Sequence, residues 1–199
     1  MDEEAPTRAA RGRPRSERAK VAVLDAASDL LVAGGIEAVT MEAIAARSKV
    51  SKATLYKWWP SRAHVMLESL FTRTEHTIAV DENASLAEVL TEQLASLARL
   101  FRDTEAGPLM ADLVAASQAD PDIRAALDEH WLRPRRQVGA GLLRAAVERG
   151  ELDPETDVAA AVDQLFAPIY HRLMMKHEPL SDELGATLVR QLLNGLRRT

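Results

Sequence analysis

Residues 40–60, TMEAIAARSKVSKATLYKWWP, decide the fold of the N-terminal part of the chain. Thr40 stands where a helix N-cap is expected, ahead of apolar residues spaced three and four apart. After a link at residues 48–50, Ser51 can cap a second short helix, which Pro60 ends. Two short helices joined in this way have the layout of a helix-turn-helix, whose second helix enters the major groove of DNA.

The second helix of this pair is the candidate recognition helix. Leu55 and Trp59 supply its buried edge, so the remaining side chains lie on or near its outer faces: Lys52, Ala53, Thr54, Tyr56 and Lys57. Donor groups on Lys52 and Thr54 are suited to contact base edges, and a small apolar side chain can contact a thymine methyl group.

Several side chains toward the end of this helix suit phosphate contacts, which position a protein without reading sequence: Tyr56, Lys57, Trp58 and Arg62. The N–H groups behind the Thr40 cap can also bind a phosphate. The alternative is that all of these are ordinary surface residues of a small helical bundle.

Basic residues are concentrated in this same part of the chain. Residues 7–62 carry eleven basic and five acidic side chains, a balance of +6. Residues 63–199 carry fourteen basic and twenty-two acidic ones, a balance of −8. With the three acidic side chains of residues 1–6, the whole chain has a net charge of −5. A basic head on an acidic body indicates that the head alone meets a polyanion.

Three motifs follow one another in this head: VTMEAIA at residues 39–45, VSKATLY at 50–56 and WPSR at 59–62. In sequence and order they resemble the DNA-binding segment of the TetR family of bacterial transcriptional regulators. The resemblance covers about residues 16–71 without gaps. It implies a helix-turn-helix head and a helical body that binds a small molecule and forms a dimer.

The resemblance also implies roles for single residues. Phosphate contacts would come from Thr40, Tyr56, Lys57, Trp58 and Arg62, and the residues nearest the bases would be Lys52, Ala53 and Thr54, with Ser51 beside them at the helix start. Many family members carry an aromatic residue at the position of Lys57 and a histidine at that of Trp58. Trp58 can therefore pack beside Trp59 instead of contacting DNA.

Residues 1–15 are expected to form a flexible basic arm, because they combine Pro, Gly and charged residues without an apolar face. Within the arm, Arg11-Gly12-Arg13-Pro14 resembles the core of an AT-hook, in which Arg11 and Arg13 enter a narrow minor groove. The alternative is a solvated tail that adds only nonspecific attraction to DNA.

The composition and the apolar spacing predict an all-α protein of about nine helices. Its expected divisions are the arm at 1–15, a helix-turn-helix domain at 16–62 and a helical ligand-binding and dimerisation domain at 63–199. Gly34-Gly35 should end the first helix, and Pro168 predicts a kink or a break. Beyond the head, a capping box that begins at Ser85 and N-cap–proline pairs at Asp120-Pro121 and Asp153-Pro154 are helix starts. The expected helices lie near 85–102, 107–118, 121–148, 154–176 and 181–196.

The body should bind an effector and a second copy of the chain. Polar and aromatic residues within apolar helices are the pocket candidates: Gln93, Met110, Gln118, Trp131, Phe166, Tyr170 and Met174, with His130, Gln137 and His171 also considered. The apolar pattern Leu184, Leu188 and Leu192 in the final helix suits a homodimer interface through the C-terminal helices. The alternative is that this helix packs within its own subunit.

Several classes of protein are disfavoured. The chain has no cysteine, and it carries no H-E-x-x-H, Walker loop, G-x-G-x-x-G or G-x-S-x-G motif. His171 and His177 are six residues apart, off the spacing of three or four that shares a helix face. We therefore expect no catalysis, no bound metal and no cofactor. No apolar run is long enough for a membrane span and no signal peptide is evident, so we expect a cytoplasmic protein without a membrane partner.

The sequence thus predicts a dimeric transcriptional regulator, most simply a repressor that a small molecule releases from double-stranded operator DNA. The alternative is a constitutive or architectural DNA-binding dimer that has no small-molecule effector. The effector, the operator, the regulated genes and the choice between repression and activation are not encoded in any motif.

Overall fold

The computed structural model describes residues 13–72 and 84–196, and this part of the chain contains helices and no strand. It divides into two compact units, Met1–Arg73 and Thr74–Thr199. The prediction of an all-helical protein is confirmed. None of the described helices is long and apolar enough to cross a membrane.

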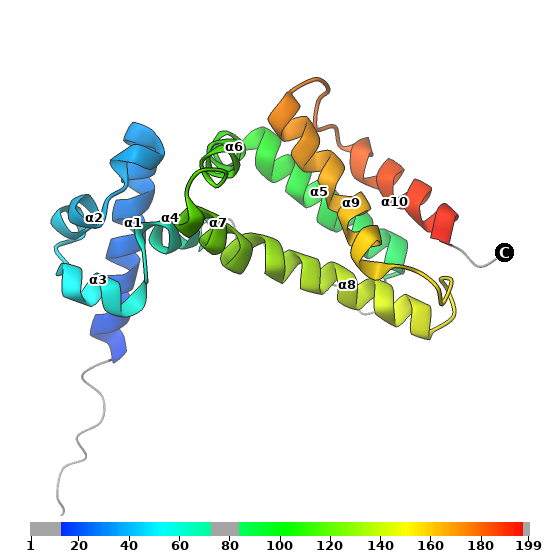
Figure 1. The fold of residues 1–199 in the computed structure, drawn as a ribbon, viewed down its shortest axis with the longest axis horizontal. Helices are drawn as coiled ribbons and strands as arrows, with labels where there is room; N and C mark the ends of the chain where they lie inside the picture. The colour runs from blue at the N-terminus through cyan, green and yellow to red at the C-terminus, as the bar shows by residue number, and fades with distance from the viewer. Residues whose placement is uncertain (1–12, 73–83, 197–199) are drawn as a thin grey trace, which may run out of the picture. The chain divides into compact units, whose positions relative to one another are not determined.

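The described residues of the N-terminal unit form four helices: α1 (Arg13–Ala38), α2 (Met41–Ser48), α3 (Lys52–Trp58) and α4 (Arg62–Thr72). Figure 1 shows α1 as the long supporting helix of this unit, and both α2 and α4 pack against it. Apolar side chains from all four helices close the core, including Leu31, Ile44, Leu55 and Met66. Because α4 packs on α1, it belongs to the head.

Helix α1 is not straight throughout. Gly34 and Gly35 have non-helical backbone angles, and Gly35 has a φ of 67°, a left-handed conformation that glycine adopts readily. The two glycines therefore interrupt the helix where the sequence predicted its end, and a further turn of helix reaches Ala38.

The C-terminal unit contains the remaining helical segments: α5 (Leu86–Asp103), α6 (Ala106–Ala116), α7 (Pro121–Leu127), the π-helical turn η1 (Asp128–Leu132), α8 (Arg133–Glu148), α9 (Val158–Met175) and α10 (Glu183–Leu196). Segments α7, η1 and α8 follow one another without a gap. Counted as one, they bring the described part of the chain to nine continuous helices.

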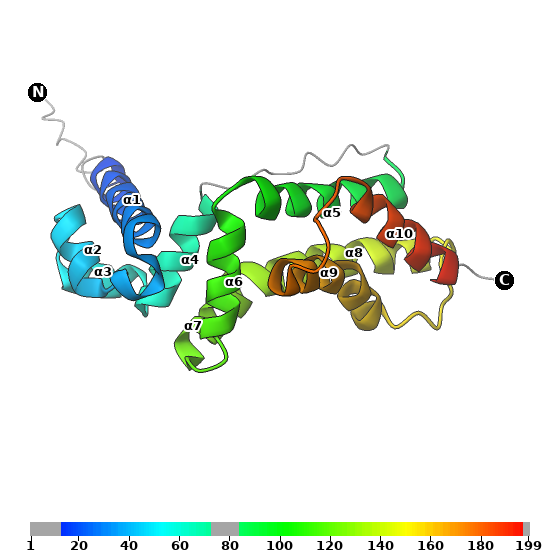
Figure 2. The same cartoon turned by 90° about the horizontal axis from the view of Figure 1, so that it is seen from above.

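The final helix packs within its own subunit. Figures 1 and 2 both show α10 alongside α5, and these two helices are in direct contact. Leu184, Val189, Leu192 and Leu193 are buried, and Gly185 allows close packing because a Cβ there would lie 3.1 Å from Cβ of Leu94. Of the leucines that suggested a dimer interface, Leu184 and Leu192 are therefore buried within the unit, whereas Leu188 is half-buried.

Three expectations for this unit need correction. The helix expected at 121–148 contains the π-helical turn η1. The helix expected to start at Asp153-Pro154 starts at Val158, after the N-cap Asp157. Pro168 does not break α9, which runs on to Met175.

Candidate nucleic-acid interface and ligand-binding region

Side-chain caps fix both helices of the helix-turn-helix. Thr40 Oγ1 accepts a hydrogen bond from the backbone N–H of Ala43 at 3.0 Å, at the start of α2. Ser51 Oγ accepts one from the N–H of Thr54 at 3.2 Å, at the start of α3. Between them, Lys49 has a φ of 58°, and this left-handed residue turns the chain from one helix into the next. The two N-caps were predicted and are confirmed.

The side chains of α3 divide into a buried and an exposed set. Leu55 is fully buried and the neighbouring Trp59 is 3% exposed, as the sequence predicted. The exposed residues are Ser51, Lys52, Ala53, Tyr56 and Lys57, whereas Thr54 and Trp58 are half-buried. Tyr56 is 55% exposed, an unusual state for an aromatic side chain. The outward face of α3 therefore carries two cations, an aromatic hydroxyl and a methyl group.

Two of the predicted base-contacting residues have partners within the helix-turn-helix. Nζ of Lys52 donates to Oε1 of Glu42 on α2 at 2.8 Å. The hydrogen bond from Lys52 holds the pKa of the Glu42 carboxyl below its ordinary value, and the same bond raises the pKa of Lys52. The Thr54 hydroxyl lies 2.9 Å from Ser51 Oγ, within hydrogen-bonding distance.

Trp58 and Arg62 contact other residues of the N-terminal unit. The Trp58 ring meets Trp59 edge-on, with centroids 5.6 Å apart, and Nζ of Lys20 lies 5.9 Å from the Trp58 ring centroid. The Arg62 guanidinium donates to the carbonyl oxygens of Ile36 at 3.4 Å and Val39 at 3.3 Å. Both side chains thus help to hold the helices of the head in place.

The proposed AT-hook motif falls only partly within the described residues. Arg11 lies outside them, and Arg13 is the first residue of α1. The segment expected as an arm at 1–15 is therefore helical from Arg13 onward.

In the C-terminal unit, the structure brings two of the predicted pocket residues into direct contact. Nε1 of Trp131, on η1, donates to the Tyr170 hydroxyl, on α9, at 2.6 Å. Trp131 is fully buried. Phe101 on α5 packs against both rings, with centroids 5.9 Å from Trp131 and 5.6 Å from Tyr170. Phe101 was missing from the sequence prediction, because nothing distinguishes it from other core residues of α5.

A half-buried cation completes this cluster. The Arg135 guanidinium stacks on Trp131, with Cζ 3.1 Å from the ring centroid, and its Nη1 donates to the Trp131 carbonyl at 3.4 Å. Burial lowers the pKa of Arg135 to about 10, so the side chain stays charged at neutral pH. Burial also raises the pKa of Tyr170, which remains a neutral phenol. We call Phe101, Trp131, Arg135 and Tyr170 the aromatic cluster.

The other pocket candidates are dispersed. Met110 is fully buried and Gln93 half-buried, whereas Gln118 and Met174 are exposed. Gln118 donates to the Val114 carbonyl and to Ser117 at the end of α6. Phe166 lies beside Gly139, where α8 and α9 meet.

The described part of the C-terminal unit includes two surface cavities that bear on a ligand site. The larger, about 580 Å³, lies where α5, α6 and the end of α9 meet; its apolar lining includes Phe101, Pro108, Leu173 and Leu180. The smaller, about 290 Å³, lies between α8 and α9 and includes Gln137 and Val162. Phe101 belongs both to the lining of the larger cavity and to the aromatic cluster.

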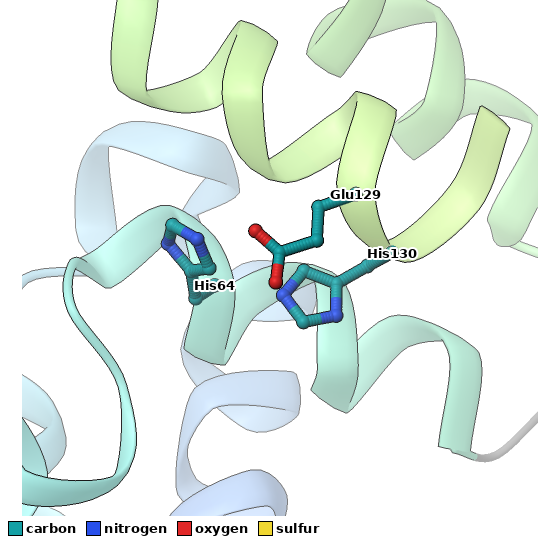
Figure 3. A group of neighbouring side chains, drawn as sticks. All are labelled: His64, Glu129 and His130. Carbon is teal, nitrogen blue, oxygen red and sulfur yellow. The ribbon is translucent and has the colours of Figure 1, made fainter. Parts of the chain in front are cut away.

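Figure 3 shows three side chains of metal-ligating types, with Glu129 and His130 on η1 and His64 on α4. His64 bonds within its own unit, where Nδ1 lies 2.9 Å from Ser61 Oγ. Glu129 and His130 alone are two neighbouring residues of one helical turn, and we assign no metal site to them.

His171 and His177 do come together, although their spacing along the chain argued against it. Their ring centroids are 4.7 Å apart. Lys176, with a φ of 52°, ends α9 in a left-handed conformation and turns the chain so that His177 lies beside the helix. Spacing rules for a helix missed this pair because they stop applying where the helix ends.

The capped pair of short helices, with an exposed basic face on the second, defines a helix-turn-helix protein of the DNA-binding class. Family models match both units. The model for bacterial regulatory proteins of the TetR family matches residues 23–68, and the model for the tetracyclin repressor-like C-terminal domain matches residues 80–192. The chain belongs to the TetR family of transcriptional regulators, which are not enzymes.

Relatives and solved structures agree with this assignment. The HTH-type transcriptional regulator YdeS of Bacillus subtilis (strain 168) is 34% identical over 95% of each chain. The DNA-binding transcriptional repressor TetR of Mycobacteroides abscessus is 29% identical over 90% of this chain and 94% of its own. The crystal structure of the TetR family regulator SCO0332 superposes with a TM-score of 0.75 and 35% identity, covering 91% of this chain and 100% of that one.

Proposed function

We propose that this protein is a dimeric repressor that holds its operator through α3 and releases it when a small molecule binds the C-terminal unit. The observation that carries the proposal is the outward face of α3, which is exposed, basic and fixed at its start by the Ser51 cap. A rigid exposed helix of this kind can enter a major groove without rearrangement of the head.

Within that groove, the side chains nearest the bases would be Lys52, Ala53 and Thr54. Lys52 suits guanine O6 and N7, and the Ala53 methyl suits the thymine methyl group. Thr54 must exchange or share its contact with Ser51 to reach a base. Thr40 and Ser51, at the helix starts, lie where backbone N–H groups bind phosphates.

The remaining positions would bind the DNA backbone. Tyr56 and Lys57 are exposed and point away from the core of the head, so they are the strongest phosphate-binding candidates. Trp58 and Arg62 would contribute mainly by holding the head in shape, given their contacts with Lys20, Ile36 and Val39. Arg11 and Arg13 would add minor-groove contacts at sites flanked by A·T tracts.

The homodimer would form through the C-terminal helices α9 and α10. Part of the apolar face of α10 packs on α5, but Leu188 is only half-buried, and α9 exposes 37% of Met174 and 63% of Met175. Two copies joined in this way present two α3 helices to two half-sites, which supplies the length of sequence that one head cannot read alone.

The effector would bind at or beside the aromatic cluster. Ligand sites combine apolar walls with a few oriented polar groups, and the cluster offers three rings, a phenol hydroxyl and a guanidinium. A ligand can shift the equilibrium between two helix arrangements only by its difference in affinity for them, typically about 1–3 kcal/mol.

Binding to the DNA that flanks the protein's own gene, measured against scrambled DNA over a range of salt concentrations, tests the DNA-binding part. We expect saturable preference for the flanking DNA, lost in Tyr56→Ala. The Glu17→Ala variant is the matched control, because Glu17 is exposed on α1 and has no place on α3. Equal and steeply salt-dependent binding to both DNAs would favour the architectural alternative.

A screen of small molecules against the protein–operator complex tests the effector part. We expect one class of compound to weaken operator binding, and we expect Tyr170→Ala to lose the response while it still binds the operator. If no compound that binds the C-terminal unit changes operator affinity, a constitutive DNA-binding dimer is the better description.

A further inference from the structure

The residue proposed to read bases is neutralised by a carboxylate on the neighbouring helix. Lys52 is the first residue of α3 and Glu42 the second of α2, so their 2.8 Å ion pair bridges the two helices of the helix-turn-helix. Both side chains are largely exposed, 53% for Lys52 and 67% for Glu42. The carboxylate therefore stands beside the surface that would face DNA.

Stability alone does not account for an acidic side chain at this position. An exposed ion pair contributes little to folding, because both charges are well solvated with or without the contact. Near DNA the same carboxylate faces closely spaced phosphate charges, which repel it. Its energetic effect is consequently larger on DNA binding than on the fold.

We propose that Glu42 is a specificity-determining residue, which keeps Lys52 from phosphates and shares it only where a base offers an acceptor. This inference rests on the proposed function, in which α3 lies in the major groove. An ammonium group has three donors, so Lys52 can keep its bond to Glu42 and still donate to guanine O6 and N7. On nonspecific DNA the neutralised Lys52 adds little to counterion release, and Glu42 adds repulsion.

The Glu42→Gln substitution tests this role in the full-length protein, with operator and scrambled DNA measured side by side over a series of salt concentrations. Affinity for scrambled DNA should rise by roughly three- to tenfold, and its logarithmic salt slope should steepen by about one, as for one additional phosphate contact. Affinity for the operator should change less, so the ratio of the two affinities falls.

Asp29→Asn is the matched control. Asp29 forms an exposed 2.8 Å pair with Arg47, so its substitution also removes one negative charge and releases one cation, but that cation is not on α3. The ratio of operator to scrambled affinity should be unchanged in Asp29→Asn. If both variants lower the ratio equally, the effect is one of net charge and the inference fails.

Lys52→Met separates the two partners. In the Lys52→Met background, Glu42→Gln should no longer steepen the salt slope, because the cation that Glu42→Gln would release is absent. Circular dichroism of each variant checks that the protein is folded. If the wild-type protein prefers its operator and Glu42→Gln has the same ratio of operator to scrambled affinity, the inference about Glu42 fails and the proposed function stands. A wild-type protein without any such preference overturns the inference and the proposed function together.

Discussion

The residues expected to carry function lie in opposite environments in the two units of this protein. In the N-terminal unit those residues are exposed, on a helix only seven residues long that is held by its cap and by Leu55. In the C-terminal unit the aromatic cluster is buried or half-buried, its residues come from segments that include two helices of eighteen residues, and they contact one another. A surface that meets DNA can be inferred from local signals, whereas an interior site depends on which helices come together.

The largest difference should appear when the buried cluster is truncated. Trp131→Ala removes a fully buried ring and leaves the Tyr170 hydroxyl without its donor, so the C-terminal unit should lose about 3–5 kcal/mol of stability. Urea unfolding followed by circular dichroism measures the loss. Tyr170→Phe, which removes the hydrogen bond but keeps the ring, should cost only about 1 kcal/mol. Similar losses in the two variants would show that the hydrogen bond, not the packing, dominates.

A smaller effect is expected where α5 meets α6. A Cβ added at Gly107 would fall on the carbonyl oxygen of Phe101, a backbone atom that cannot turn away. Gly107→Ala should therefore destabilise the C-terminal unit by about 1–3 kcal/mol, as overpacking does elsewhere. Gly195→Ala, whose Cβ meets open space, is the comparison and should unfold at nearly the wild-type urea concentration.

The cap of the recognition helix tests the head in the same way. Ser51→Ala removes the acceptor for the Thr54 N–H and should cost about 1 kcal/mol, together with a loss of operator affinity. Ser85→Ala removes the corresponding cap of α5, where the structure has a full capping box. It should cost a similar free energy of unfolding without changing operator affinity. If Ser85→Ala weakens operator binding as much as Ser51→Ala does, the cap of α3 has no special role in DNA binding.

The smallest expected effect is a dependence on pH. Since Lys52 lowers the pKa of Glu42 in the folded protein, the pair stabilises the head above the ordinary carboxyl value of 4.5 and is lost as pH falls through the lowered pKa. Titration of the Glu42 carboxyl by NMR should give a pKa below 4.5, which moves back up in Lys52→Met. An identical pKa in both proteins would contradict the pairing.

Sequence signals that act within a few residues were the reliable ones. Thr40, Ser51 and Ser85 each cap the helix that they were expected to cap, because an N-cap needs only a side chain and the N–H two or three residues later. The burial of Leu55 and Trp59 was predictable for the same reason, since both follow from spacing along one short helix.

Asp153 shows how a correct local signal is overridden. Its side chain accepts from the N–H of Glu155 at 2.8 Å, but its own N–H bonds to the carbonyl of Leu196, at the end of α10, at 2.9 Å. The segment is thus tied to a distant part of the chain as a turn, and α9 begins only after Asp157, whose side chain accepts from Ala160. Nothing near Asp153 in the sequence indicates that bond.

The ligand-binding region was predictable in part. Trp131 and Tyr170 were chosen as polar aromatic residues in apolar helices, and they proved to be hydrogen-bonded partners thirty-nine residues apart. Phe101 and Arg135, which complete the cluster, carry no local signal. Their places depend on how α5, η1 and α9 pack, and that is a property of the whole unit.

The π-helical turn η1 determines which face of α8 points toward α9. A π-turn contains one residue more than an α-turn, and each residue of an α-helix advances the face by about 100°. The extra residue lets Gly139 meet Val162 and Phe166 on α9 while Val138 faces outward. Deleting one residue between Asp128 and Leu132 would rotate α8 by about 100°, so that Gly139 takes the outward position of Val138 and Ala140 takes the position facing α9. The register of the helix pair therefore depends on the number of residues in this turn more than on their identity.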